Sequence, residues 1–266
     1  MTAFDADSKV VKPKPLARLT AIAMNLTVYP LVALWTLFGI FFFLPGLGVW
    51  KVFTGWSTGK IMRHFIWLYG RGWIAIISPF VRFSRQGLSR ERPGPCILVI
   101  NHLSFFDTYC MALLPVFDIA FAVRAWPFRM IWYAYFMRLA EYLNVESGEW
   151  QEITSRAEGI FARGGSVLFF PEGHRSRDGE LQHFYSGAFR LAVETGRPVV
   201  PLCITGTETL LPPGRFWLRP AAVTLRVLDP VDPADFPGPD GHARLRKEVK
   251  ALIAANLKEM RRGEGA

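Results

Sequence analysis

A histidine and an aspartate five positions apart are the first residues in this sequence with the chemistry of a catalytic pair. They stand in NHLSFFD, residues 101–107, directly after the apolar run CILVI. His102 in a strand-to-helix turn could act as a general base whose imidazole Asp107 orients. Ser104 and Asp107 also fit a capping box, in which both side chains bind free backbone groups of a new helix. Five positions correspond to roughly 140° around a helix, so the pair requires His102 to lie outside it.

A second polar segment, FFPEGHRSRDGELQHFYSGAF, covers residues 169–189 and begins at the end of an apolar strand pattern. Glu172, Gly173 and Arg175 would then lie at the carboxyl end of a strand, where open α/β sheets bind ligands. Arg175 there could bind a phosphate or a carboxylate through two parallel hydrogen bonds. The alternative is a solvated loop with an ordinary turn at Asp178.

Metal and nucleophile motifs are not expected. GWSTG, residues 55–59, has the spacing of a nucleophile elbow but follows a segment broken by proline and glycine instead of a buried strand. The five histidines have no metal-ligand spacing with cysteines or acids, so neither a metal nor a cofactor is predicted. Cys96, Cys110 and Cys203 lie in apolar runs without a CxxC pair, which is typical of reduced core thiols.

Short apolar runs alternate with helical patterns after residue 95, which predicts an α/β fold with a largely parallel sheet flanked by helices. The expected strands cover residues 96–100, 119–123, 166–171, 198–205 and 222–228. The expected helices cover residues 105–114, 127–140, 149–162, 187–195 and about 241–260.

The N-terminal third is basic and apolar. Residues 1–95 contain 12 Lys and Arg against 3 Asp and Glu, whereas the remainder contains 19 of each. No charged residue occurs between Leu19 and Trp50, a length sufficient to cross a bilayer. A buried soluble helix and a cleaved signal peptide are the alternatives. The charge favours an anionic membrane surface over nucleic acid as the partner, and no nucleic acid is expected.

A second apolar segment, residues 65–81, predicts that the N-terminal region is a helical hairpin dipping into one leaflet. The turn-rich SRERPGP, residues 89–95, predicts a boundary between a membrane-associated region, 1–90, and an α/β domain, 91–266. The positive-inside rule places both ends of the hairpin in the cytoplasm. Its basic flanks are Lys9, Lys12, Lys14, Arg18, Lys51, Lys60 and Arg63.

NHLSFFD, FPEGHRS and VVPLCITG occur in an order and at a spacing that resemble the glycerolipid acyltransferase family, the lysophosphatidic acid acyltransferases in particular. The resemblance implies that His102 is the general base and Asp107 its orienter. It also implies that Glu172, Gly173 and Arg175 form the acceptor-binding loop. Pro201 matches the last motif, for which a role in acyl-chain binding and a role in packing are both open.

The sequence departs from the family pattern at three places that bear on acceptor recognition. His174 replaces the usual threonine of FPEGTRS, and Tyr185 and Ser186 stand where lysines are common. The segment LNVESG, residues 143–148, carries Glu146 and no arginine where the family often has one.

The resemblance therefore implies a membrane-bound O-acyltransferase at the cytoplasmic face of the inner membrane. It would move a fatty acyl group from acyl-CoA or acyl-carrier protein to the hydroxyl of a lysolipid, with 1-acylglycerol-3-phosphate as the first expectation. A lysolipid with a phosphodiester or amino-acid head group is an alternative acceptor. A membrane thioesterase and a non-catalytic lipid-binding protein are the alternative functions.

Overall fold

A seven-stranded sheet forms the centre of the molecule, and its neighbours follow the order β1-β7-β6-β2-β5-β3-β4. The computed structural model describes residues 15–87, 94–146 and 149–263. All neighbouring strands are parallel except β6 and β7, so the predicted α/β class with a largely parallel sheet is confirmed. The strands are β1 (Val81–Gln86), β2 (Ile97–Ile100), β3 (Ile119–Val123), β4 (Leu143–Asn144), β5 (Ser166–Phe169), β6 (Val199–Thr205) and β7 (Ala221–Val227).

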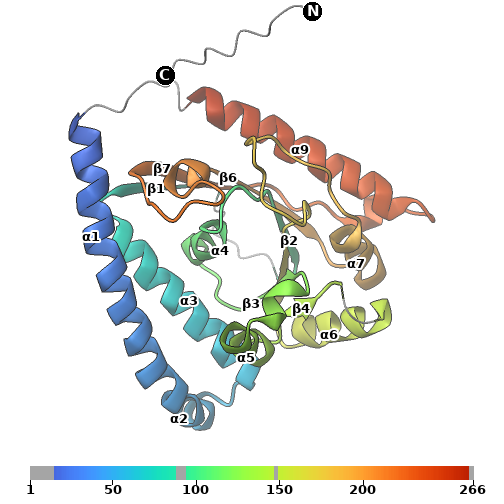
Figure 1. Cartoon of the computed structure of the whole chain (residues 1–266). Coiled ribbons are helices and arrows are strands. Elements are labelled where there is room, and N and C mark those ends of the chain that lie inside the picture. The colour runs from blue at the N-terminus through green and yellow to red at the C-terminus, as the bar shows by residue number, and fades with distance from the viewer. Residues whose placement is uncertain (1–14, 88–93, 147–148, 264–266) are drawn as a thin grey trace, which may run out of the picture.

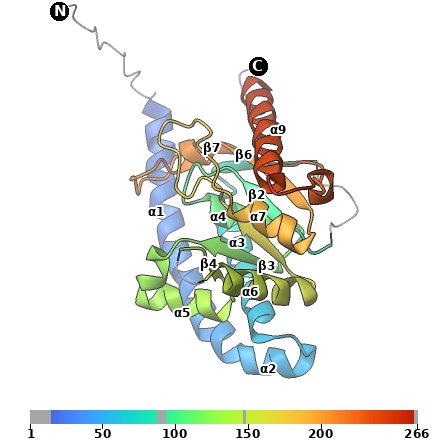
Figure 2. The ribbon, with the colours of Figure 1, turned by 90° about the vertical axis from the view of Figure 1, so that its right-hand side faces the viewer.

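Helices cover both faces of the sheet (Figures 1 and 2). Helices α6, α7 and α9 pack on one face, and α3 packs with α1, α4 and α5 on the other. The α-helices are α1 (Pro15–Phe38), α2 (Leu44–Thr54), α3 (Thr58–Ile77), α4 (Asp107–Cys110), α5 (Ile131–Leu139), α6 (Trp150–Ala162), α7 (Gly187–Thr195), α8 (Thr207–Leu210) and α9 (Gly241–Gly263). Short helices with other hydrogen-bond patterns are η1 (Gly39–Phe43), η2 (Met111–Leu113), η3 (Trp126–Arg129) and η4 (Pro233–Asp235).

The five expected strands are present, and the differences are local. Strands β1 and β4 were not expected, and the predicted helix 105–114 is divided into α4 and η2. The predicted boundary at residues 89–95 lies mainly outside the described residues. Strand β1 nevertheless pairs with β7, so residues 81–86 of the expected N-terminal region belong to the sheet.

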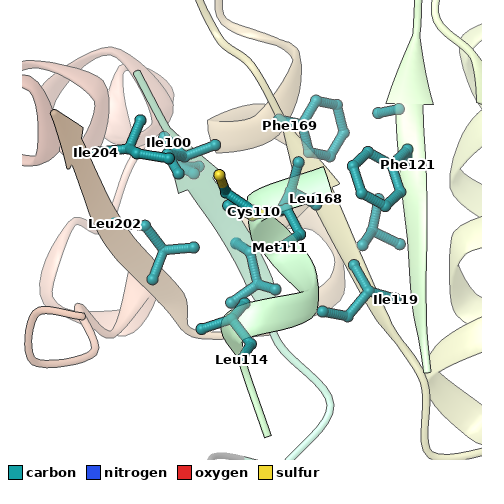
Figure 3. Packing of buried hydrophobic residues seen from close by; sticks show 14 of the residues in the cluster. Ile100, Cys110, Met111, Leu114, Ile119, Phe121, Leu168, Phe169, Leu202 and Ile204 are labelled. Carbon is teal, nitrogen blue, oxygen red and sulfur yellow. The ribbon is translucent and has the colours of Figure 1, made fainter. Parts of the chain in front are cut away.

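The core lies where α4 and η2 meet the middle strands (Figure 3). Cys110, Met111 and Leu114 are buried against apolar residues of the strands. Every residue of β2, β5 and β6 is buried as well. Such runs are typical of parallel strands covered on both faces. The strand residues of this cluster are Ile100, Ile119, Phe121, Leu168, Phe169, Leu202 and Ile204.

The N-terminal helices form the predicted hairpin, in which α1, η1 and α2 lead outward and α3 returns against α1. The helical run Leu16–Thr54 has 39 residues and a mean hydropathy of 2.0 in its most apolar part, of which only 6% is buried. By length and composition it could cross a membrane. Helix α3 differs, because Ile61, Met62, Phe65 and Trp73 are buried within the protein.

An ionic cluster joins α3 to the α/β domain. The fully buried Arg63 donates from Nε to Asp118 over 2.7 Å, and from Nη1 to the Ala140 carbonyl and to Glu141. Lys60 lies 3.5 Å from Asp118 on the opposite carboxylate oxygen. Arg63, expected as one of the basic residues flanking the apolar segment, is therefore buried within the protein and paired with two carboxylates.

We expect Arg63→Met to lower the free energy of unfolding by about 3–5 kcal/mol, because it removes the buried guanidinium from the buried Asp118 and leaves that carboxylate with the more distant Lys60 as its cation. Thermal unfolding of the full chain in detergent micelles measures the loss. The control is Arg156→Met, which removes an exposed i,i+4 pair with Glu152 and should cost about 1 kcal/mol or less. Equal melting temperatures for the two variants would contradict the structural role of Arg63.

Candidate active site

A cavity of about 600 Å³ opens beside the carboxyl ends of β2, β3 and β5. His102 follows β2, Arg124 follows β3, and Arg175 lies in the loop after β5, and all three side chains line it. Parallel neighbouring strands bring these turns together, as open α/β sheets do at their ligand sites. The remaining wall is mainly apolar and includes Ile66, Phe105, Tyr109, Phe121, Val123, Met137 and Phe170.

His102 and Asp107 form a direct hydrogen bond, with 2.8 Å between Nδ1 and Oδ2. Asp107 is completely buried, and the His102 side chain is 16% exposed at the cavity. His102 lies in the turn before α4 and not within the helix, which is the condition that the five-residue spacing requires. Bonding at Nδ1 leaves Nε2 as the nitrogen that can accept a proton from a substrate.

The same carboxylate caps the turn. Asp107 Oδ2 accepts the backbone N–H groups of Leu103 at 2.7 Å and Ser104 at 2.8 Å. The Ser104 hydroxyl accepts the N–H of Phe106 and donates to the carbonyl of Leu211. One side chain makes both sets of bonds, so the capping and orienting interpretations of Asp107 do not exclude each other.

Two supporting residues were not identified from the sequence. The Thr207 hydroxyl donates to Asp107 Oδ1, and Thr207 is fully buried. Asn101 joins the ends of β2 and β6 by exchanging two 2.9 Å hydrogen bonds with the backbone of Ile204. Thr207 directly follows the VVPLCITG motif, and this position is the sequence feature that could have identified it as a site residue.

Glu172 holds the backbone of the turn that carries His102. Its two carboxylate oxygens accept the N–H of His102 at 2.7 Å and the N–H of Gln182 at 2.8 Å. Burial raises the pKa of the Glu172 carboxyl, and the two backbone hydrogen bonds oppose that rise. Glu172 is 1% exposed and does not belong to the cavity wall.

The loop after Glu172 reaches the cavity through Gly173 and Arg175. Gly173 has a φ of +70°, and a Cβ there would lie 2.9 Å from the ring of Tyr185, so both conformation and space favour glycine. The backbone N–H of Ser176 donates to the His102 carbonyl over 2.8 Å. The loop is thereby fixed against the turn that carries the His–Asp pair.

Arg124 and Glu146 form an ion pair at the wall of the cavity, with 2.5 Å between Nε and Oε1. The N–H of Ala125 donates to the second oxygen over 2.8 Å. This backbone bond holds the pKa of Glu146 below its usual value against the opposing effect of burial, and the Arg124 guanidinium lowers it further. The Arg124 guanidinium and the Glu146 carboxylate therefore each have a partner within the protein, and both also line the cavity.

Pro201 lies apart from this group, buried in β6 opposite Val99 of β2. It is not part of the cavity wall, and its carbonyl accepts the N–H of Leu228 over 2.9 Å. In the described part of the chain, no group of three or more His, Cys, Asp or Glu side chains is arranged to hold a metal ion.

Comparison with known proteins places the same segment in a family. Residues 81–205 match the family model Acyltransferase. The chain is 34% identical over 165 residues to the chloroplastic 1-acyl-sn-glycerol-3-phosphate acyltransferase BAT2 of Brassica napus, covering 57% of this chain and 45% of that protein. The Salmonella typhimurium 1-acyl-sn-glycerol-3-phosphate acyltransferase is 34% identical over 95 residues, which cover 36% of this chain and 38% of that protein.

A solved structure is similar over nearly the full length. The 1-acyl-sn-glycerophosphate acyltransferase PlsC from Thermotoga maritima has a TM-score of 0.68 and 25% identity, covering 91% of this chain and 97% of that chain. The matches to the curated plant and bacterial relatives named above extend over less than half of each relative's length. Residues 81–205 thus match the acyltransferase family model, and the chain is similar to 1-acyl-sn-glycerol-3-phosphate acyltransferases in sequence and in structure.

Proposed function

We propose that this protein transfers a fatty acyl group from an acyl-CoA or acyl-carrier-protein thioester to the hydroxyl of a lysolipid, with 1-acylglycerol-3-phosphate as the first acceptor. The observation that carries the proposal is the His102–Asp107 hydrogen bond beside a largely apolar cavity. The names of the relatives support the acceptor.

His102 acts as the general base in this reaction. Nε2 takes the proton of the acceptor hydroxyl as its oxygen attacks the thioester carbonyl carbon, and Asp107 stabilises the imidazolium that forms. The tetrahedral intermediate then expels the thiolate, which receives the proton from His102. The new ester and a free thiol are the products, so no covalent acyl-enzyme is required.

The cavity provides the apolar environment that an acyl chain needs. Its wall follows β3 from Val123, near His102, to Ile119 at the opposite end of the strand. Aromatic and aliphatic side chains from α3, α5 and the α4 region complete the wall, and burial of each methylene stabilises binding by about 0.8 kcal/mol.

The acceptor head group meets a site with limited free positive charge. Arg175 is exposed at the cavity, whereas Arg124 is paired with Glu146. A phosphate monoester would bind Arg175 together with backbone N–H groups of the loop. Glu146 is not a free carboxylate for an ammonium group, because both of its oxygens already accept hydrogen bonds.

The site would act at the cytoplasmic face of the inner membrane, with the helical run Leu16–Thr54 embedded in lipid. Its outward side chains are apolar over several turns, with Leu26 72% and Phe53 84% exposed. Exposure of these apolar side chains to water is unfavourable, whereas lipid chains would cover them.

We expect His102→Ala to reduce transfer by about 10² to 10⁴, because the reaction loses its general base. Asp107→Asn should lose most activity as well, because a neutral amide stabilises the imidazolium poorly. Product analysis with purified protein, thioester and lysolipid measures both variants, and circular dichroism controls for folding. Near-normal turnover by Asp107→Asn would contradict the orienting role of Asp107 and leave only its role in capping the turn. Free fatty acid without diacyl product from the wild-type protein would indicate a thioesterase instead.

We expect Glu146→Gln to raise kcat/KM for lysophosphatidate severalfold relative to a lysolipid with a phosphodiester head group, because it releases the positive charge of Arg124. Arg175→Ala should lower the same ratio. Competition between the two lysolipids at equal concentration gives the ratio directly. Glu152→Gln, in an exposed pair with Arg156, is the control for loss of one negative charge. An unchanged ratio in both Glu146→Gln and Arg175→Ala would place head-group recognition elsewhere.

Replacement of Phe41, Phe42 and Phe53 by glutamine should weaken association with anionic vesicles, because each loses about 2 kcal/mol of apolar transfer. All three side chains are more than 60% exposed, so the fold should remain. Vesicle flotation is the measurement, and Val193→Gln on α7 is the control for an exposed apolar residue outside the hairpin. Unchanged flotation of the triple variant would argue against embedding of this helix.

A further inference from the structure

The connection between β6 and β7 displays two adjacent aromatic side chains on the surface. In the segment PPGRFWLRP, residues 212–220, Phe216 is 88% and Trp217 is 48% exposed. Exposed Arg215 and Arg219 flank them. Adjacent exposed aromatic residues of this size are characteristic of contact surfaces. We call residues 212–220 the Phe–Trp loop.

The structure holds this loop in place against α1, so its exposure does not result from a loose end. The Asn25 side chain is 4% exposed, donates to the Leu218 carbonyl over 2.8 Å and accepts the Leu218 N–H over 3.0 Å. The Tyr29 hydroxyl donates to the carbonyl of Phe216. Leu218 itself is 1% exposed and anchors the loop between these bonds.

The loop continues an apolar surface of α1. Ile22, Leu26 and Tyr29 are exposed and follow one another at helical spacings of four and three, so they form one row. The row ends at Tyr29, the residue that binds the backbone of Phe216. Two sequence segments almost two hundred residues apart are therefore held side by side, and each exposes apolar side chains.

The chemistry of this surface fits the interface of a phospholipid bilayer. Tryptophan is enriched where lipid meets water, because its ring is apolar and its N–H is a donor. Arginines at the same level attract anionic lipid head groups. A water-filled environment would leave Phe216 unfavourably exposed.

We propose that the Phe–Trp loop is a second membrane anchor, separate from the N-terminal hairpin, that inserts Phe216 and Trp217 into an anionic bilayer interface with Arg215 and Arg219 at the phosphates. This rests on the proposed membrane association of α1 and extends it to a segment of the catalytic domain.

The anchor is close in sequence to two residues that contact the turn of the catalytic pair. Thr207, which binds Asp107, and Leu211, whose carbonyl accepts the Ser104 hydroxyl, lie in the same connection. The N–H of Arg219 donates to the Leu210 carbonyl and closes the base of the loop on α8. Insertion of the loop would thus fix the orientation of the catalytic turn relative to the bilayer.

The test uses a fluorophore at the tip of the loop. The three native cysteines are buried, so Phe216→Cys in the full chain can be labelled selectively with the polarity-sensitive fluorophore NBD. Ala254→Cys on α9 is the control, since it is exposed and lies on a helix away from α1 (Figures 1 and 2). Both proteins are reconstituted into liposomes that contain phosphatidylglycerol.

We expect the label at position 216 to shift its emission to shorter wavelength and to be quenched by lipids that carry a nitroxide near the head group. The label at position 254 should show neither effect. Emission at position 216 equal to that at position 254 in liposome-bound protein would overturn the proposal. A blue shift that no quenching lipid affects, and that disappears as protein is diluted in lipid, would identify a second copy of the chain as the occupant and would also overturn it.

The charge contribution is tested on the same labelled protein. Arg215→Gln together with Arg219→Gln should reduce quenching in anionic liposomes, whereas Lys247→Gln with Lys258→Gln on α9 should not; equal quenching in the two double variants would contradict the role of the arginines. The fluorescence does not depend on turnover. Failure of wild-type transfer with normal quenching would refute the proposed function and leave the anchor intact.

Discussion

The buried carboxylate of Asp107 is the interaction on which the site depends. It accepts hydrogen bonds from the His102 ring, two backbone N–H groups and the Thr207 hydroxyl. Hydrogen bonds to a charged group contribute about 1.5–3 kcal/mol each, and a buried charge without partners costs several kcal/mol. The turn after β2 and the turn after β6 must therefore stay together, and the Asn101 bonds to Ile204 keep those strand ends aligned.

A second carboxylate, that of Glu172, also holds His102. Asp107 fixes the imidazole ring, whereas Glu172 fixes the backbone N–H of the same residue. The ring of Phe170 lies 4.1 Å from that of His102 between centroids and packs beside it. The ring and the backbone of His102 are therefore held by separate groups.

The sequence predicted the parts of this arrangement that are local. The apolar runs of β2, β3, β5, β6 and β7 were sufficient to place the sheet, and the spacing from His102 to Asp107 was sufficient to propose the pair. Strand β1 was not predicted because, at the sheet edge, most of its residues are exposed and no apolar run marks it. Thr207 was missed because one hundred residues separate it from Asp107, and only the adjacency of β2 and β6 brings them together. The pairing of Arg124 with Glu146 depends in the same way on β3 lying beside β4.

The bonds between Asn25 and Leu218 have a consequence for the order of assembly. Their partners are 193 residues apart. At a ribosomal rate of about 5–20 residues per second, roughly 10–40 s pass between synthesis of the two. Through that interval the amide oxygen of Asn25 lacks its native donor, the Leu218 N–H. The attachment of α1 to the β6–β7 connection can consequently form only after every strand except β7 has been synthesised.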